Sequence, residues 1–472
     1  MAQAYDLVVI GAGTGGYVAA IRAAQLGLKT AVVERQKALG GTCLIWGCIP
    51  TKALLEHAHA FKIMQRASEW GVEFGGATPT LDLAAVHARQ DKIVTGLTKG
   101  VEGLFKKNGI TWIKGTARLA GKGKVVVTGG DDQELTAKHI LVATGSSPRS
   151  VPGVTIDHTR IITSDEAIHL KDVPKSIVVL GSGAVGVEFG SIFNRFGSAV
   201  TIVELLSRLV PVEDEAVSAE LTRSFRKQGI TALTGTKVTK AEVTGTTVTL
   251  SAQLADGKTE TLQADYLLVA TGRGPVVEGL GAEAVGLEIQ KGFVKVDEFY
   301  RTNVEDISAV GDVITFGEGT RHPQLAHVSS AEGILVAERL AGQDVRPINY
   351  DHAPGCTYCD PEIGSVGLTE QTARDRGFDV QIGTFPFRAL GRARMADELD
   401  GFVKIVADKK YGEILGVHII GPRATEIIAE AVLALRMECT VEELVHTIHA
   451  HPTMSEAMGE AAHAAHGGAI HI

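Results

Sequence analysis

Two cysteines near the N-terminus have a spacing that could support redox chemistry. Cys43 and Cys48 lie in the segment GGTCLIWGCIPTK, residues 40–52. In a regular helix, residues five apart are separated by about 7.5 Å along the axis, which is too far for a disulfide. Gly47 and Pro50 favour a local break in the helix that could bring the thiols together. A strained, accessible disulfide is readily reduced, as a catalytic couple requires, but the spacing alone equally allows two structural cysteines.

A second segment, near the C-terminus, combines two histidines with a glutamate. It reads HAHPTMSE and contains His449, His451 and Glu456. A lone histidine is most often structural, and a metal site would need a third convincing ligand group, which does not accompany these residues. In a third interpretation, the carboxylate orients and charges an imidazole that acts as a base. Thiol–disulfide exchange needs such a base, because the thiolate is the attacking species.

A CxxC pair forms a third candidate. Cys356 and Cys359 have His352 nearby, which indicates either a zinc site or a second redox couple. A lone CxxC is weak evidence for both. We therefore expect two reduced structural thiols at the start of a sheet domain, and no resident metal ion.

The elements that must position these residues include a repeated pattern. The run LVVIGAGTGG begins at residue 7, and IVVLGSGAVG begins at residue 177, which is 170 residues later. Each copy continues with a helical pattern, an apolar strand and a glutamate, Glu34 or Glu204. This pattern predicts two βαβ units, each with a glycine-rich turn that lets a pyrophosphate approach the start of a helix. A single GxGxxG is weak evidence, whereas two copies in register favour two bound dinucleotides. The fingerprint glycines are Gly11, Gly13 and Gly16 in the first copy, and Gly181, Gly183 and Gly186 in the second.

The second glutamate also bears on the choice of nicotinamide cofactor. Glu204 suits a ribose with a free 2′-hydroxyl and would repel a 2′-phosphate, so the sequence favours NAD over NADP. Arg208 stands four residues later, near the place where NADP sites usually have an arginine. We expect Arg208 to be a solvated surface charge.

Composition limits the class of protein. The chain has 472 residues, enough for about three domains. Its 46 basic and 55 acidic residues give a formal net charge of −9, which argues against a broad surface for nucleic acid or anionic lipid. Five cysteines are too few, and odd in number, for a secreted disulfide framework. We expect neither a signal peptide nor a membrane span, and hence a cytoplasmic protein.

The pattern GGTCxxxGCxPxK resembles the signature of the flavin-dependent pyridine nucleotide–disulfide oxidoreductase family. The resemblance implies that FAD is the first dinucleotide, NAD is the second, and the cysteine pair is a redox-active disulfide beside the flavin. It further implies that Cys48 contacts the flavin and that Cys43 exchanges with the substrate. Lys52 would lie near the reactive nitrogen of the flavin, paired with Glu188. The alternative for Lys52 is a surface position on the helix that starts near Pro50.

Other segments resemble the family's cofactor contacts. Residues 143–145 and 270–272 resemble the turns at which the chain leaves each nucleotide domain. Residues 309–312 resemble the second FAD motif, in which the aspartate binds the ribityl chain, although Asp312 could also be a turn residue or a helix cap. Besides the fingerprints and Glu34, the resemblance implies FAD contacts at Gly41, Thr42, Lys52, Ala117, Thr144, Gly145, Asp312 and Ala326. For NAD, it implies contacts at Glu188 and Gly272 besides Glu204.

The motif HPTxSE resembles the family's catalytic segment. By this resemblance His451 is the base, Glu456 is its orienting acid, and His449 is a neighbour. In the family this segment reaches across a two-fold axis into the disulfide site of the partner subunit. We therefore expect an active homodimer.

The expected fold class is α/β, with two Rossmann-like dinucleotide-binding domains and a C-terminal α+β dimerisation domain. In that last domain, residues 399–406 and 413–420 read as strands, and residues 425–437 read as a helix. The expected segments are an FAD domain over residues 1–148, an NAD domain over 149–275, a return to the FAD domain over 276–346, and an interface domain over 347–472.

Within the family, the chain is most similar along its whole length to the branch that oxidises dihydrolipoyl groups and reduces NAD. The tail over residues 464–472 and the segment 385–392 fit this branch, whereas Ile45-Trp46 replaces the family's usual Asn and smaller residue. The expected partners are a lipoyl-bearing acyltransferase subunit or the lipoyl protein of glycine cleavage. The alternatives are a reductase of another disulfide or of a metal ion, and a docking scaffold within a large complex.

Overall fold

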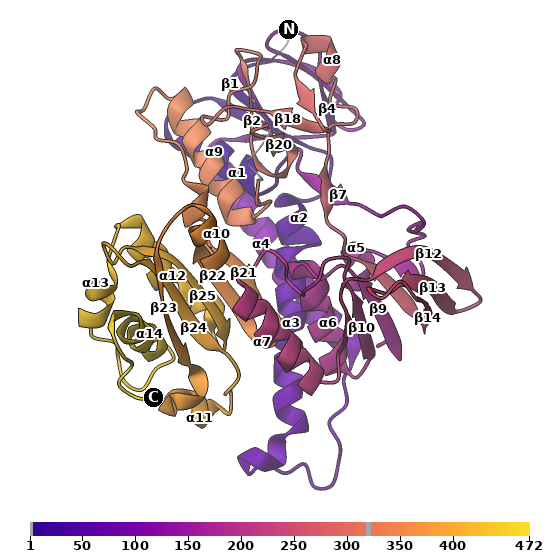
Figure 1. Ribbon diagram of the computed structural model, residues 1–472. Coiled ribbons are helices and arrows are strands. Elements are labelled where there is room, and N and C mark those ends of the chain that lie inside the picture. Colours follow the sequence, from indigo (N-terminus) through magenta and orange to yellow (C-terminus); the bar gives the residue numbers. More distant parts are fainter. Residues whose placement is uncertain (1–2, 318–321) are drawn as a thin grey trace. The chain divides into compact units, whose positions relative to one another are not determined.

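The computed structural model describes residues 3–317 and 322–472 (Figure 1). The chain forms two compact units, each made of separate segments, and each is described by itself. Unit 1 comprises Met1–Ala53, Ala84–Arg149 and Gly272–Ile348. Unit 2 comprises Leu54–Leu83, Ser150–Thr271 and Asn349–Ile472. The division into four segments expected from the sequence stays a prediction.

Unit 1 is built on a sheet with the strand order β3-β2-β1-β6-β5-β4, in which β19 also pairs with β6. The strands β3, β2, β1, β6 and β19 run parallel, whereas β5 and β4 extend the sheet in antiparallel fashion. Residues 7–10 are buried apolar residues, as expected for a strand covered on both faces. The strands are β1 (Gln3–Ile10), β2 (Thr30–Glu34), β3 (Thr111–Lys114), β4 (Thr116–Leu119), β5 (Lys124–Thr128), β6 (Gln133–Val142) and β19 (Ile307–Ala309).

Helices α1 and α9 of unit 1 pack against each other. The helices that lie wholly or partly in this unit are α1 (Thr14–Gln25), α2 (Gly41–Ile45), α3 (Cys48–Gln65), α4 (Leu83–Lys107), α8 (Ala282–Val285), η2 (Gly311–Val313) and α9 (Ala326–Leu340). The smaller sheets pair β7 (Ser146–Pro148) with β16 (Arg273–Pro275), and β18 (Phe293–Lys295) with β17 (Ile289–Gln290) and β20 (Ile314–Thr315).

Unit 2 contains a second parallel sheet, with the strand order β11-β10-β9-β15-β8. An antiparallel sheet, β12-β13-β14, belongs to the same segment of the chain. The strands are β8 (Ile161–Ile162), β9 (Ser176–Leu180), β10 (Ala199–Val203), β11 (Thr231–Leu233), β12 (Lys237–Thr244), β13 (Thr247–Gln253), β14 (Thr259–Ala264) and β15 (Tyr266–Val269). The helices of this segment are α5 (Ser164–Ala167), α6 (Ala184–Phe196) and α7 (Glu215–Lys227).

The C-terminal part of unit 2 is an antiparallel sheet with the strand order β21-β22-β25-β24-β23. Helices α12 and α14, drawn in yellow in Figure 1, pack against its strands. The strands are β21 (Gly355–Thr357), β22 (Glu362–Gly367), β23 (Val380–Pro386), β24 (Phe402–Asp408) and β25 (Ile414–Gly421). The remaining helices of unit 2 are η1 (Ala67–Trp70), η3 (Tyr350–His352), α10 (Glu370–Asp375), η4 (Phe387–Ala389), α11 (Gly391–Ala396), α12 (Ala424–Arg436), α13 (Val441–His446) and α14 (Glu456–His466).

The two strands and the helix expected here are present, but β24 begins three residues later than the sequence predicts. The reason lies at Gly401, which has φ +102°. A Cβ at this position would lie 1.8 Å from the carbonyl oxygen of Ile420, so only glycine fits there. The chain therefore turns at Gly401, and β24 pairs with its neighbours only after this turn. Of the helices in residues 3–317 and 322–472, none combines the length and apolar character needed to cross a membrane.

Candidate redox and dinucleotide sites

The helix breaks between the two cysteines of the GGTCxxxGC segment. Helix α2 ends before Trp46, whose backbone is not helical (φ −141°, ψ 15°), and α3 begins at Cys48. Figure 1 shows the two helices as successive elements of the indigo part of the chain. A Cβ on Gly47 would lie 2.8 Å from the Thr42 carbonyl oxygen, so this tight connection requires glycine. The break brings the side chains of Cys43 and Cys48 into a hydrogen bond, as the spacing argument requires.

Charged groups control the protonation of this pair. Both cysteines are thiols in this structure. The hydrogen bond with Cys48 raises the pKa of the Cys43 thiol, and burial, the charge of ionised Cys48 and the charge of Asp312 raise it further. The Lys52 ammonium acts in the opposite direction. Cys43 therefore holds its proton more tightly than an ordinary cysteine does, which suits a pair that uses one thiolate at a time.

An arginine that the sequence did not single out connects the surroundings of the pair. Arg273 donates hydrogen bonds to Ser146 Oγ (2.8 Å), to the Ser146 carbonyl (2.7 Å) and to Thr42 Oγ1 (3.4 Å). Ser146 Oγ in turn donates to Asp312 Oδ2 at 2.5 Å. Arg273 thus joins the start of the cysteine segment to the expected ribityl-binding aspartate. In the sequence, its position directly after the 270–272 turn is the feature that could have identified Arg273 as part of the site.

A buried pair of hydrogen-bonded side chains supports the turn that carries Asp312. Glu332 of α9 accepts the Gly311 amide on Oε2 and His322 Nε2 on Oε1, both at 2.7 Å. Glu332 is fully buried, and His322 is 8% exposed. The sequence did not indicate either residue, because their pairing depends on how α9 packs.

The fingerprint glycines have two different roles. A Cβ on the third glycine, Gly16 or Gly186, would lie 2.0 Å from the carbonyl oxygen of the first glycine in the same copy. A Cβ on the second glycine, Gly13 or Gly183, would meet no atom within 4 Å. The third glycine is therefore required by packing of helix on strand, whereas the space beside the second glycine fits a pyrophosphate at the start of α1 or α6.

The backbone of each fingerprint holds its own glutamate. The Ala12 amide donates to Glu34 Oε2 at 2.7 Å, and the Ser182 amide donates to Glu204 Oε2 at 2.8 Å. In both copies, the amide two residues after the glutamate donates to Oε1 at 2.8 Å. The second copy adds a bond from Ser182 Oγ to Glu204 Oε2 at 2.7 Å. Oε2 of Glu204 thus accepts two donors, and Oε1 keeps an acceptor position for a ribose hydroxyl.

The two fingerprint copies also match in the loop that follows each glutamate. The Gly40 amide donates to the Ala12 carbonyl at 2.9 Å, and the Val210 amide donates to the Ser182 carbonyl at 3.2 Å. These positions are again 170 residues apart. Gly40 has φ +119° and Val210 has φ +41°. A β-branched residue is strained in this region of backbone space, so the second copy closes its loop at a conformational cost that the first copy avoids.

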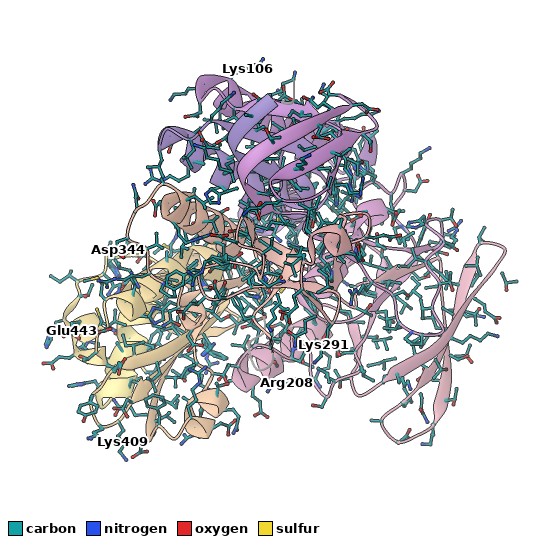
Figure 2. The ribbon with its side chains drawn as sticks, turned by 90° about the horizontal axis from the view of Figure 1, so that it is seen from above. Lys106, Arg208, Lys291, Asp344, Lys409 and Glu443 are labelled. Atoms are coloured by element: carbon teal, nitrogen blue, oxygen red, sulfur yellow. The ribbon has the colours of Figure 1, made fainter. Side chains whose placement is uncertain are left out.

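The expectation that Arg208 is a solvated charge is wrong. Arg208, labelled in Figure 2, lies on the loop between β10 and α7 and is half-buried. Its Nη2 donates to the carbonyls of Pro211 (3.1 Å) and Glu213 (3.2 Å). The loop folds back and supplies acceptors that the local sequence could not reveal.

The remaining expected cofactor residues lie on several elements. Thr144 Oγ1 donates to the Val276 carbonyl at 2.6 Å, and Ala117 is a buried residue of β4. Gly145 and Gly272 occupy turns with φ +70° and +110°. Gly41 begins α2, and Ala326 begins α9.

The two residues of the expected pair, Lys52 and Glu188, belong to different units. Glu188 is buried on α6, where its Oε1 accepts the Tyr358 amide at 3.0 Å within unit 2. Lys52 lies in unit 1 near the cysteine pair. Their mutual pairing stays a prediction.

The C-terminal histidine segment forms a His–carboxylate pair. His451 Nδ1 lies 2.7 Å from Glu456 Oε1, and the Thr453 amide donates to Glu456 Oε2 at 2.8 Å. Burial tends to raise the pKa of Glu456, but the bonds from His451 and Thr453 outweigh it and lower the pKa. The carboxylate is therefore charged at neutral pH and orients the imidazole. The His451 side chain is 78% exposed, so its Nε2 side is accessible.

The CxxC cysteines make separate contacts. Cys356 Sγ lies 4.0 Å from the Thr425 carbonyl, and Cys359 Sγ donates to the Pro361 carbonyl at 3.2 Å. Burial raises the pKa of the Cys359 thiol. Across residues 3–317 and 322–472, no three His, Cys, Asp or Glu side chains gather in a group that could hold a metal ion. These contacts support two structural thiols.

Two family models match the chain. Residues 5–333 match the model described as "Pyridine nucleotide-disulphide oxidoreductase", and residues 353–462 match the dimerisation domain of the same description. The second match supports a homodimer.

Several known proteins are similar to this chain over nearly its whole length. The chain is 45% identical to "Dihydrolipoyl dehydrogenase" of Bacillus subtilis (strain 168), with 100% of both chains covered. It is 43% identical to "Leghemoglobin reductase" of Glycine max, over 97% of this chain and 87% of that protein. Among solved structures, LpdA from Mycobacterium tuberculosis aligns with a TM-score of 0.87 at 27% identity, over 98% of this chain and 99% of that one.

Proposed function

The chain belongs to the pyridine nucleotide–disulphide oxidoreductase family, and we propose that it is a dihydrolipoyl dehydrogenase, which oxidises dihydrolipoyl groups and reduces NAD. The family and the α/β fold class expected from the sequence are confirmed, and the protein is a flavoprotein disulfide oxidoreductase. The observation that carries the proposal is the helix break that places the Cys43 and Cys48 thiols in contact, beside Lys52 and Asp312. The 45% identity to a full-length dihydrolipoyl dehydrogenase supports the choice of substrate.

Members of this family use FAD and a nicotinamide nucleotide. We assign FAD to the fingerprint of unit 1, with Glu34, and NAD to the fingerprint of unit 2, with Glu204. The space beside Gly13 and Gly183 fits a pyrophosphate in each case. When bound, the two cofactors supply the electron and hydride transfer that side chains cannot perform. The other FAD contacts proposed are Gly11, Gly16, Gly41, Thr42, Lys52, Ala117, Thr144, Gly145, Asp312 and Ala326, and the other NAD contacts are Gly181, Gly186, Glu188 and Gly272.

The protein's own groups carry the thiol chemistry. His451 takes a proton from one thiol of the dihydrolipoyl group, and Glu456 stabilises the imidazolium that forms. The thiolate attacks Sγ of Cys43, which breaks the enzyme disulfide and leaves Cys48 as a thiolate. The second thiol of the substrate then attacks the mixed disulfide, which forms the cyclic lipoyl disulfide and releases Cys43. At the end of the exchange, the substrate is oxidised and the enzyme holds the dithiol.

The proposal extends to partners and location. We propose that His451 acts in the disulfide site of the partner subunit, and that the substrate is carried by an acyltransferase subunit or by a glycine-cleavage lipoyl protein. A cytoplasmic location is also part of the proposal, and cell fractionation tests it. The proposed segments are the FAD domain over residues 1–148 and 276–346, the NAD domain over 149–275, and the interface domain over 347–472.

The test follows NADH absorbance after the purified, FAD-loaded protein receives NAD and dihydrolipoamide. A parallel reaction with reduced glutathione is the control. Rapid NADH formation with the lipoyl substrate alone is the expected result. No NADH from FAD-loaded protein would contradict the proposal and direct the search to other disulfides and to metal ions.

A further inference from the structure

We infer that Lys404 is a positioning residue for NAD: it fixes the loop that closes over the second glycine fingerprint to the sheet of the dimerisation domain. The inference rests on the proposed function, in which NAD binds at this fingerprint. Lys404 lies on β24, within the residues that match the dimerisation model, whereas the fingerprint lies between β9 and α6. Both belong to unit 2.

The loop between β10 and α7, residues 204–214, is in direct contact with the fingerprint turn. The Val210 amide donates to the carbonyl of Ser182, which stands between Gly181 and Gly183, at 3.2 Å. Val210 is buried and has φ +41°, which is strained for a β-branched residue. Such a conformation persists only where the surrounding structure fixes the chain. The groups that fix this loop therefore bear on the shape of the nucleotide site.

The start of α7 holds the strained residue from the side opposite the fingerprint. Asp214 is the N-cap of α7, and its Oδ1 accepts the Ala216 amide at 3.0 Å. Ser218 donates its amide to the Asp214 carbonyl at 3.0 Å and its hydroxyl to the Val210 carbonyl at 3.3 Å. Asp214 and Ser218 are both buried, so these bonds are shielded from water. The position of Asp214 thus determines where Val210 lies.

Lys404 ties Asp214 to the dimerisation domain. Its Nζ lies 2.9 Å from Asp214 Oδ1 and 2.8 Å from Oε2 of Glu370 on α10. The Glu370 amide donates to Asp214 Oδ2 at 3.1 Å. Burial acts to raise the pKa of Asp214, but the bonds from Lys404 and from the Glu370 amide oppose it, and the pKa is lowered. Lys404 is 6% exposed, so the two residues form a buried ion pair.

A continuous series of hydrogen bonds therefore joins β24 to the fingerprint. It passes from Lys404 to Asp214, through Ser218 to Val210, and from Val210 to Ser182. Removing one partner of a buried ion pair leaves the other charge uncompensated, so the start of α7 should shift toward water or another donor. The closed loop then becomes less stable relative to an open loop. NAD binds more weakly in proportion, because a smaller fraction of the protein has the closed site.

Two variants test this role when NAD affinity and stability are measured separately. Lys404→Met keeps a side chain of similar length but removes the cation, so the dissociation constant for NAD should rise about tenfold. The double variant Lys404→Met with Asp214→Asn also removes the uncompensated charge, and asparagine still caps a helix. It should regain thermal stability without regaining NAD affinity, because the bond between β24 and α7 is still missing. Calorimetric titration of the FAD-loaded protein with NAD gives the affinity, and thermal scans give the midpoints.

A purely structural role of Lys404 predicts a different result. The affinity for NAD would then recover together with the stability in the double variant, and the KM for dihydrolipoamide would rise along with the KM for NAD. Either result, or an unchanged dissociation constant for NAD in Lys404→Met, would overturn the inference. If Lys404→Met does not fold, the double variant is compared with the parent, and parent-like NAD affinity in that variant would overturn the inference.

Thr425→Ala provides the matched control. It removes a 2.8 Å bond from Thr425 Oγ1 to Glu362 Oε2 of β22, in the same domain, without touching the loop. Its affinity for NAD should equal that of the parent. An equal loss of affinity in Thr425→Ala and Lys404→Met would show that any disturbance of the dimerisation domain has this effect, and would contradict a specific role of Lys404.

The titration also separates this inference from the proposed function, because binding of NAD requires no turnover. If the parent binds NAD but forms no NADH from dihydrolipoamide, the proposed function fails, yet the titrations still test Lys404. If the parent is active and Lys404→Met binds NAD as tightly as the parent, only the inference fails. A parent protein that binds no NAD would overturn both.

Discussion

The hydrogen bond between Cys43 and Cys48 raises the pKa of the Cys43 thiol, and the charge of Lys52 opposes that shift. In the proposed roles, Cys43 exchanges with the substrate and Cys48 holds the negative charge, and a Cys43 that holds its proton tightly is compatible with this division. Each thiol is therefore expected to be indispensable for a different reason.

Replacing Cys48 by serine should leave FAD bound and abolish lipoyl turnover. A serine hydroxyl cannot form the disulfide, so the loss of kcat should be at least about a thousandfold. Flavin absorbance measures cofactor retention, and NADH formation measures turnover. Cys439→Ser, which alters a partly buried cysteine of unit 2, is the matched control and should keep its activity. Turnover in the Cys48→Ser protein would disprove the mechanism.

Ser182 should tune the affinity for NAD rather than the chemistry. Ser182→Ala removes the hydroxyl bond to Glu204 Oε2 and leaves the amide bond in place. A bond of about 1 kcal/mol corresponds to a roughly fivefold higher KM for NAD, with kcat unchanged at saturation. The control is Ser224→Ala, because Ser224 is fully buried and its hydroxyl has no hydrogen-bond partner in the described structure. An unchanged KM for NAD would show that the serine has no such role.

At the scale of elements, the sequence predicts those features that a local pattern determines. The glycine fingerprints, the buried strands and the break at Gly47 follow from periodicity and backbone freedom. The start of β24 was misplaced because Gly401 contacts a strand that follows it in the chain. The hydrogen bonds of Arg273 and Glu332 were not predicted, because their partners are distant in the chain. The bond of Arg208 was not predicted, because it depends on how its loop folds back.

The loop before α7 also carries a buried acid. Burial raises the pKa of Glu213 to about 7, although a hydrogen bond with Ser365 of β22 opposes the shift and the charge of Asp214 adds to it. The ordinary value of this carboxyl is 4.5, so between pH 4.5 and 7 the folded protein holds a proton that the unfolded chain has released. The free energy of unfolding therefore falls as the pH rises through that window.

Glu213→Gln should remove this pH dependence. Glutamine stays neutral, so the variant should be more stable than the parent at pH 8, by roughly 3 kcal/mol at most, and should gain little at pH 4.5. Thermal midpoints at the two pH values provide the measurement. Glu215→Gln alters an exposed carboxylate at the start of α7 and should change neither midpoint by much. A Glu213→Gln protein whose midpoint advantage is equal at both pH values would contradict the assigned cause.

At the scale of the whole molecule, one architecture is used twice and then completed by a dimerisation domain. The βαβ unit recurs with matching hydrogen bonds, and residues 353–462 match the dimerisation model. The exposed His451 lies within a chain expected to pair with a second copy. Whether the base serves its own chain or its partner is therefore a question about the dimer.

A mixed dimer answers that question. When Cys43→Ser and His451→Gln protomers carry different tags, the doubly purified heterodimer has one site with an intact disulfide and an intact base from the other subunit. We expect about half of the parent activity from this heterodimer, and almost none from either mutant homodimer. A heterodimer as inactive as the two homodimers would show that the base acts within its own chain.

The single difference between Gly40 and Val210 has a consequence for how long each cofactor stays. In the first copy the loop closes without strain, so nothing in the loop itself favours release, as suits a prosthetic group retained through many cycles. In the second copy the loop closes over the fingerprint with a valine at φ +41°, and relief of that strain favours opening. Easier opening suits a nucleotide that must leave after every turnover, because the residence time of the nucleotide falls as the closed loop becomes less stable relative to the open loop. We therefore expect the cofactor of the first copy to stay bound longer than the cofactor of the second copy.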